Sequence, residues 1–159
     1  MLIRFAIDAD IPGIRCLQDQ VLELHAAGRP DIFHSGTRKY TDDEIRALIA
    51  DDDRPLFVAV AEDAVPGEIM GHVICKIINY QSGEDRQPIR TLHIDELVVN
   101  ETVRRQHVGT DLYHHVLDWA RERGLYNVTL SVWQCNPGAR AFYEAMGMQV
   151  MKTEMESML

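Results

Sequence analysis

The sequence predicts one α/β domain built around a mixed sheet. Its 159 residues suit a single domain, over residues 1–159, that buries a substantial core. Apolar residues make up 46% and charged residues 26%, which is typical of an ordinary globular domain. Runs with strand and helix periodicity follow one another in the order β, α, α, β, β, β, α, β, α, β, without repeats or linkers. This order indicates an α/β domain.

The first half of the chain is expected to supply three strands and two helices. Residues 2–7 have the short alternating pattern of a strand. A helix should follow to about Gly28, because Pro12 suits its first turn and apolar residues recur at helical spacing at Ile14, Leu17, Val21 and Leu24. Thr41 and Glu44 have the spacing of a capping box for a second helix. Residues 55–61 and 68–78 then form a hairpin.

The second half begins with a strand over residues 92–99, a polar turn, and an amphipathic helix over about residues 107–123. Residues 127–133 are expected as the next strand, and a fourth helix should begin near Asn136. Residues 148–159 alternate like a terminal pair of strands. Met151, Met155 and Leu159 share one face of this segment and form a candidate homodimer surface. The alternative is that these side chains pack into the core of their own chain.

Charge and cysteine content argue against several classes of function. The net charge of −9 disfavours non-specific nucleic-acid binding and an anionic membrane surface, and it favours a cationic small partner. Cys16, Cys75 and Cys135 are too few and too scattered for a disulfide framework or a metal knuckle. The sequence has no pattern of a signal peptide or a membrane span. We therefore expect a cytoplasmic protein without nucleic-acid or membrane partners.

The turn over residues 103–112 has the features of an anion-binding site. It lies between a strand and a helix N-terminus, where backbone N–H groups and the helix dipole favour a phosphate. It matches neither a Walker loop nor a dinucleotide-binding turn, which need Gly-x-x-x-x-Gly-Lys-Ser/Thr and Gly-x-Gly-x-x-Gly. Arg104 and Arg105 give this turn a local positive charge, although the chain as a whole is acidic.

Two segments resemble the signatures of the GNAT acetyltransferases. Residues 104–109 are similar to the family's Arg/Gln-x-x-Gly-x-Gly/Ala pyrophosphate loop, with His107 in place of the first glycine. Residues 136–148 resemble the family's Asn-x-x-Ala-x-x-Phe-Tyr-x-x-x-Gly-Phe. The resemblance implies a mixed, mostly antiparallel sheet with a splayed central strand pair and helices on both faces. If the position of His107 needs a positive φ, histidine has a modest energetic cost there.

The resemblance also implies an N-acetyltransferase that moves an acetyl group from acetyl-coenzyme A to a primary amine by direct attack, without a metal. The acceptor would be a small cationic amine or a peptide amine, contacted by Phe33, His34 and Glu96. The alternative is a non-catalytic acyl-coenzyme A binding module. The residues implied to bind acetyl-coenzyme A are Leu97, Val98, Val99, Arg104, Arg105, Gln106, His107, Val108, Gly109, Thr110 and Asn136.

Three side chains are candidates for catalysis. Tyr143 suits protonation of the departing thiolate, because a thiol has a pKa near ~8.5 and its sulfur benefits from a proton at neutral pH. Core packing explains Phe142 better than Tyr143, because the residue after Phe142 is expected to turn away from the core face. His93 and Asp95 are candidates for the base, because alternation would place residues 93, 95, 97 and 99 on one face and residue 96 on the other. Histidine has the more suitable intrinsic pKa, whereas Asp95 would need a raised pKa or a relaying water. Each of the three also has a purely structural alternative.

A metal site is a weaker alternative on the expected third helix. His107, Asp111, His114 and His115 have spacing that suits one exposed helix face. No cysteine or further acid completes a ligand shell there, so a solvated polar face is the preferred interpretation.

Overall fold

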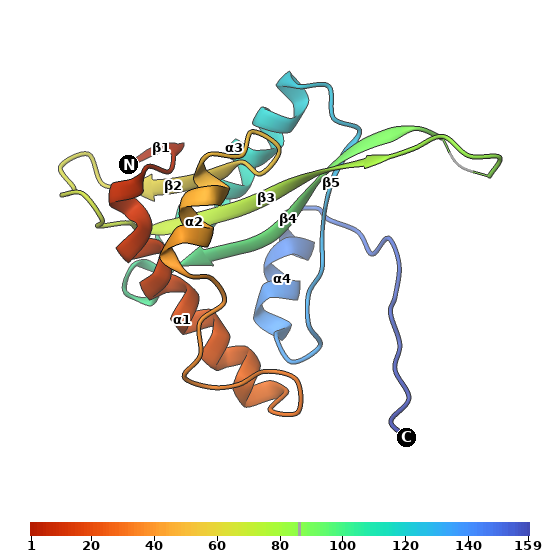
Figure 1. Cartoon of the computed structure of the whole chain (residues 1–159), viewed down its shortest axis with the longest axis horizontal. Coiled ribbons are helices and arrows are strands. Elements are labelled where there is room, and N and C mark those ends of the chain that lie inside the picture. Colours follow the sequence, from red (N-terminus) through yellow and green to blue (C-terminus); the bar gives the residue numbers. More distant parts are fainter. Residues whose placement is uncertain (86) are drawn as a thin grey trace.

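The computed structural model describes residues 1–85 and 87–159, and it contains a five-stranded mixed sheet with helices on both faces (Figure 1). Neighbouring strands are antiparallel except for the parallel pair β4 and β5. The predicted fold class is therefore confirmed. The strands lie across the sheet in chain order, as β1 (Leu2–Phe5), β2 (Leu56–Val60), β3 (Gly71–Tyr80), β4 (Ile89–Val99) and β5 (Asn127–Leu130).

Four α-helices occur in the described part of the chain, and their N-termini follow local sequence signals. They are α1 (Ile11–Gly28), α2 (Asp42–Ile49), α3 (Val108–Glu122) and α4 (Pro137–Ala145), with short 3-10 turns at Asp8–Asp10 and Glu101–Val103. The capping box of α2 is present, since the backbone N–H of Glu44 donates to Oγ1 of Thr41 and the Glu44 carboxylate accepts from the backbone N–H of Thr41. No helix in these ranges has the length and apolar character needed to cross a bilayer.

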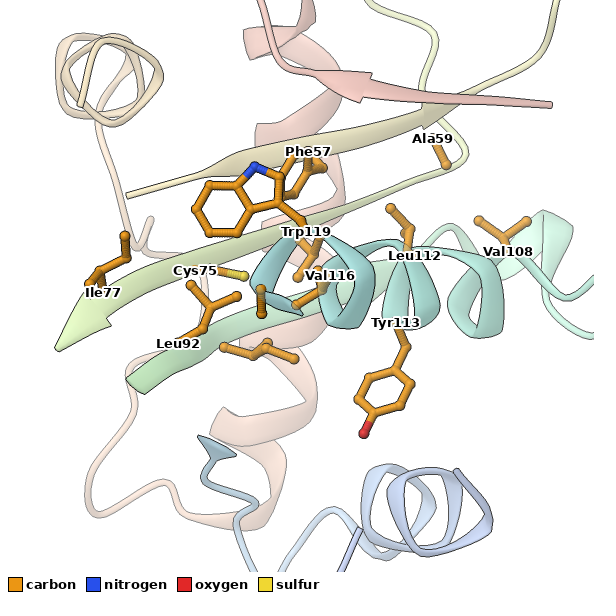
Figure 2. Packing of buried hydrophobic residues seen from close by; sticks show 13 residues of the cluster. Phe57, Ala59, Cys75, Ile77, Leu92, Val108, Leu112, Tyr113, Val116 and Trp119 are labelled. Carbon is orange, nitrogen blue, oxygen red and sulfur yellow. The ribbon is translucent and has the colours of Figure 1, made fainter. Parts of the chain in front are cut away.

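Each face of the sheet buries its own apolar cluster. On one face, α1 and α2 pack Ile14, Leu17 and Ile45 against β2 and β3. On the other face, α3 packs on the sheet and shares an apolar cluster with Cys75 and Leu92 (Figure 2). The ring of Tyr113 leaves α3 in the direction of α4, so the second cluster extends from the sheet to that helix.

The central strand β4 contains one more residue than the matching stretch of β3. Ile74 pairs with Glu96 and the next residue, Cys75, pairs with Ile94, so Asp95 forms a β-bulge. An unpaired residue in one strand shifts the inward and outward alternation on either side of it.

The bulge changes which side chains of β4 share a face. Leu92 and Leu97 both belong to the apolar cluster under α3, on opposite sides of the bulge. Glu96 contacts α1 on the other face, and His93, adjacent to Leu92, also faces away from α3. The prediction that residues 93, 95, 97 and 99 share one face, with Glu96 opposite, is therefore wrong.

The C-terminal part of the chain has less strand structure than its sequence pattern indicates. The strand expected over residues 127–133 ends at Leu130. Residues 149–159, which we call the tail, contain no strand and extend away from the body (Figure 1). The predicted terminal strand pair is therefore wrong for the single chain, because no neighbouring strand meets the backbone groups of the tail.

Candidate active site

Three elements meet at Gly109, the second residue of α3. A Cβ atom at this position would lie 3.3 Å from Cγ2 of Val99 at the end of β4 and 3.6 Å from Cζ of Phe142 on α4. Glycine therefore permits a close approach of the three elements. As a result, the N-terminus of α3, the end of the central strand and the helix that carries Tyr143 adjoin one another.

The turn before α3 leaves backbone donors open. Arg105 and His107 have left-handed conformations, with φ of 65° and 63°. His107 therefore occupies the positive-φ region that its position could have required, at a cost on the order of 1 kcal/mol. His107 is the N-cap of α3, but its side chain makes no capping hydrogen bond. The N–H groups of the first turn therefore stay available to an anion, and the exposed Arg104 and Arg105 add positive charge.

The parallel strands β4 and β5 pair over a short stretch only. Their register runs from Thr91 opposite Asn127 to Ile94 opposite Leu130, where β5 ends. β4 continues to Val99, and its residues from the bulge onward are paired with β3 alone. The other edge of residues 95–99 therefore offers main-chain groups to a ligand, in agreement with the predicted splayed strand pair.

Tyr143 is half-buried between α4 and α3 and packs against the apolar cluster under α3, so the prediction that it turns away from the core is wrong. Its ring centroid lies 6.0 Å from that of Tyr113 and 5.1 Å from that of Phe142. Burial raises the pKa of the Tyr143 phenol, and the Cys75 and Tyr113 side chains raise it further. The phenol is therefore protonated at neutral pH, which is the state that a proton donor requires.

His93 is half-buried on the sheet face that carries α1 and α2. Its Nδ1 lies 3.0 Å from Oγ1 of Thr129 on β5. Burial lowers the pKa of His93, and the charge of Asp95 only partly opposes this effect. The imidazole is therefore neutral at pH 7 and able to accept a proton.

Asp95, the bulge residue, is paired with a side chain that the sequence did not point to. Nη2 of Arg54 donates to Oδ2 of Asp95 at 2.7 Å. Both side chains are about a quarter exposed, at 26% and 24%, so the pair contributes little to stability. The pair affects the site electrostatically, because the positive charge of Arg54 balances the negative charge of Asp95.

Glu96 is buried on the same face as His93, and its carboxylate is fully engaged by the chain itself. Burial alone would raise the pKa of Glu96, but the hydrogen bond with His72 and the charge of Lys39 lower it to about 2. Burial lowers the pKa of Lys39, but Glu96 more than offsets this, so that pKa is raised. The carboxylate oxygens lie 2.7 Å from Nε2 of His72, 3.0 Å from Nε2 of Gln18 and 2.9 Å from Nζ of Lys39.

The loop that joins α1 to α2 reaches across to the segment after β5. Phe33 packs edge-on against Trp133, with ring centroids 5.1 Å apart, and its other neighbour is His25 at 5.2 Å. His34 is exposed on this loop. Lys39 fixes the far end of the loop to Glu96. Of the three candidate substrate contacts, Phe33 and His34 therefore lie on the loop, whereas Glu96 lies beneath it.

The remaining candidate residues have mainly structural surroundings. The side chain of Asn136 accepts a hydrogen bond from the backbone N–H of Ala139 at 3.1 Å and caps α4, as expected. Val98 and Val108 are buried in the two apolar clusters, whereas Gln106 is exposed and Thr110 is half-buried. Within residues 1–85 and 87–159, no three or more His, Cys, Asp or Glu side chains are grouped as metal ligands, including those of α3.

Sequence reasoning missed five side chains near this site, and two of them, Gln18 and His72, could have been found because they are polar residues at positions with a buried pattern. Gln18 follows Ile14 by four residues, so it is a polar residue on the apolar face of α1. His72 is likewise a polar residue within a buried strand. Lys39, Arg54 and Trp133 have no such pattern around them.

Comparisons with known proteins agree with these features. The model of the acetyltransferase (GNAT) family matches residues 19–148. A protein of Methanocaldococcus jannaschii named as an uncharacterised N-acetyltransferase is 28% identical over 133 residues, which is 82% of this chain and 56% of that protein. The chain therefore spans little more than half the length of this relative.

Solved structures show the same fold. A tetramutant of the BH1408 protein from Bacillus halodurans has a TM-score of 0.94 and 26% identity, with all of both chains covered. An aminoglycoside acetyltransferase from an uncultured soil sample, solved in complex with sisomicin, has a TM-score of 0.68 and 17% identity over 99% of this chain and 95% of that one.

Proposed function

Because this chain belongs to the acetyltransferase (GNAT) family, we propose that it transfers an acetyl group from acetyl-coenzyme A to a primary amine by direct attack. The observation that carries the proposal is the meeting of three elements at Gly109. The open N–H groups before α3 suit a diphosphate, and the free edge of residues 95–99 suits the pantetheine amides and the thioester oxygen.

The acceptor amine must lose its proton, and we assign this proton to His93. Its imidazole is neutral, and because Nδ1 is engaged with Thr129, Nε2 is the nitrogen that would accept the proton directly or through one water. Asp95 is less suited to this role because Arg54 already balances its charge. In this proposal, Asp95 and Arg54 set the electrostatics beside the base.

The departing sulfur needs a hydrogen-bond donor, and we assign this role to Tyr143. Its raised pKa keeps the phenol protonated. Burial also raises the pKa of the neighbouring Cys75 thiol. A thiolate released in the same surroundings would therefore be a strong proton acceptor, which offsets the weak acidity of the Tyr143 phenol.

The acceptor is proposed to be a small cationic amine, an amino sugar or a peptide amine. The net charge of −9 supports a cationic acceptor. The two acids on β4 do not add support for a cationic acceptor, because Asp95 is already paired with Arg54 and Glu96 with Lys39. Attraction would instead come from the net negative charge of the chain as a whole. The aminoglycoside acetyltransferase solved with sisomicin supports the inclusion of amino sugars in an acceptor panel.

The test combines calorimetry with release of free thiol from acetyl-coenzyme A. Binding of coenzyme A, followed by thiol release with at least one of the polyamines, amino sugars, amino acids or short peptides, is the expected result. Binding without thiol release for any acceptor would favour the alternative, a non-catalytic acyl-coenzyme A binding module. No binding by correctly folded protein would refute both.

A further inference from the structure

The loop between α1 and α2 is fastened near its far end by one lysine. Nζ of Lys39 lies 2.9 Å from Oε2 of Glu96, and the Lys39 side chain is 38% exposed whereas that of Glu96 is 5% exposed. Among the described residues, Lys39 is the one lysine or arginine within hydrogen-bond distance of this carboxylate. A primary ammonium group of the chain itself is therefore bound on the sheet face that carries His93.

The Glu96 carboxylate is held in place independently of Lys39. Nε2 of Gln18 on α1 donates to Oε1 of Glu96 at 3.0 Å, and Nε2 of His72 on β3 lies 2.7 Å from the same oxygen. All three side chains are buried. The Tyr40 ring centroid lies 5.3 Å from Nζ of Lys39, within the range of cation–π attraction. We call this ammonium site, formed by Glu96, Gln18, His72 and Tyr40, the anchor site.

Another cation can enter the anchor site only in exchange for Lys39. Removing one partner of a buried ion pair is costly, because the remaining charge is left uncompensated. Replacing one ammonium group by another avoids this cost, since Glu96 keeps a positive partner. The partly exposed Lys39 side chain can carry its released ammonium group to water. The anchor site therefore favours an acceptor with an ammonium group over one with a neutral group at the same place.

The spacing of Glu96 and His93 indicates how many amines the acceptor has. Their partners on β3 are Ile74 and Lys76, which are two positions apart in that strand. Two positions of a strand correspond to about 6 to 7 Å, and residues at this spacing share a face. During acetyl transfer, the nitrogen at His93 loses its proton, whereas a nitrogen paired with Glu96 keeps its charge. Two separate nitrogens are therefore needed to use both side chains.

We propose that Lys39 occupies, in the free protein, the site for a second ammonium group of the acceptor, and that a linear diamine binds by displacing it. One end of the diamine is then paired with Glu96 while the other end lies at His93. Lys39 is a specificity-determining residue, because it yields the anchor site to a dication and keeps it against a monoamine that can reach only one of the two positions. This role rests on the proposed function, and it is tested without acetyl-coenzyme A so that the two can fail separately.

The first test follows the Lys39 ammonium group of the wild-type chain by NMR, with isotope label in the lysine side chains. The chain has three lysines, so Lys76 and Lys152 are internal controls, and Lys39→Arg identifies the Lys39 signal. Saturation with putrescine or cadaverine should make the Lys39 ammonium protons exchange with water at least about 10-fold faster, because they leave the buried carboxylate. The exchange rates at Lys76 and Lys152 should stay unchanged. An unchanged rate at Lys39 with the diamine bound would overturn the proposal.

Calorimetry on a matched pair of variants measures the competition. Lys39 lowers the apparent affinity of the wild type for a diamine by occupying the anchor site. Lys39→Met removes this competitor and should lower the Kd for putrescine by about 10-fold or more, whereas Lys39→Arg keeps a competing cation and should not. Arg121→Met controls for the lost charge, because Arg121 is exposed and lies on α3, on the opposite face of the sheet. This control should keep the wild-type Kd.

Monoamines separate anchoring at Glu96 from general attraction to an acidic chain. Butylamine and pentylamine should bind the wild type at least about 10-fold more weakly than putrescine and cadaverine, because they lack the charged group that pairs with Glu96. Equal affinities for monoamine and diamine, no tighter binding by folded Lys39→Met, or no diamine binding by the wild type would each refute the proposal. If Lys39→Met does not fold, proton exchange at Lys39 in the wild type decides.

The outcome is independent of the test for acetyl transfer. Release of Lys39 by a diamine in a protein that never releases thiol from acetyl-coenzyme A would support the anchor site and refute the proposed activity. Thiol release with a diamine that leaves Lys39 on Glu96 would support the activity and refute the anchor site.

Discussion

Replacing Glu96 by glutamine should weaken the fold by about 3 kcal/mol at neutral pH. The pKa of Glu96 falls from 4.5 to about 2 on folding, and at about 1.4 kcal/mol for each pKa unit this difference corresponds to about 3 kcal/mol. Breaking a fully buried ion pair costs about 3 to 5 kcal/mol. The lower end applies here because the Lys39 side chain is 38% exposed and can turn to water.

The sign of the pH dependence follows from the direction of the shift. A carboxyl group with a lowered pKa contributes its full stability above the unfolded pKa of 4.5 and loses it as the pH falls towards 2. Between pH 5 and pH 3, about 2 kcal/mol of this contribution should disappear from the wild type. Glutamine does not titrate, so the Glu96→Gln variant should lose that much less over the same range.

Urea unfolding at pH 7, 5 and 3 measures both effects. Glu68→Gln is a suitable control, because Glu68 is exposed and its replacement should change stability by less than about 0.5 kcal/mol. Equal stabilities of wild type and Glu96→Gln at pH 7, or parallel losses between pH 5 and pH 3, would show that this buried carboxylate is not held in its charged form by Lys39 and His72.

Three further outcomes test the proposed chemistry. Tyr143→Phe should lower kcat about 10- to 1000-fold with little change in the Kd for coenzyme A, and an unaltered kcat would remove the phenol from the mechanism. If His93 is the base, kcat/KM should rise with pH through a pKa below 6.5, and His93→Ala should abolish this limb while Asp95→Ala keeps it. His107→Gly should raise the free energy of unfolding by about 1 kcal/mol by relieving the positive φ, and a decrease would reveal a stabilising contact of the imidazole.

Local features of the fold followed from the sequence because short-range interactions determine them. The capping box of α2 joins Thr41 and Glu44, which are three residues apart. The start of α3 and the cap at Asn136 likewise depend on neighbouring residues. The order of strands and helices from β1 to α4 was therefore predictable from periodicity and caps.

The bulge and the ion pairs were not predictable, because they arise from pairing between distant segments. The extra residue in β4 is visible only when β3 is laid beside it. Arg54 and Asp95 are 41 residues apart, and Lys39 and Glu96 are 57 apart. A single sequence has no signal for such partners. The missed bulge also explains why the predicted faces of β4 were wrong.

His93 and Tyr143 lie on opposite faces of one sheet, so the two proposed proton-transfer groups belong to different halves of the molecule. Tyr143 packs into the cluster under α3, whereas His93 faces the side of α1 and α2. Under the proposed function, substitutions in the loop over residues 29–40 are therefore expected to change the choice of amine acceptor. The same substitutions are expected to leave the Kd for coenzyme A unchanged, because the turn before α3 and Tyr143 lie elsewhere.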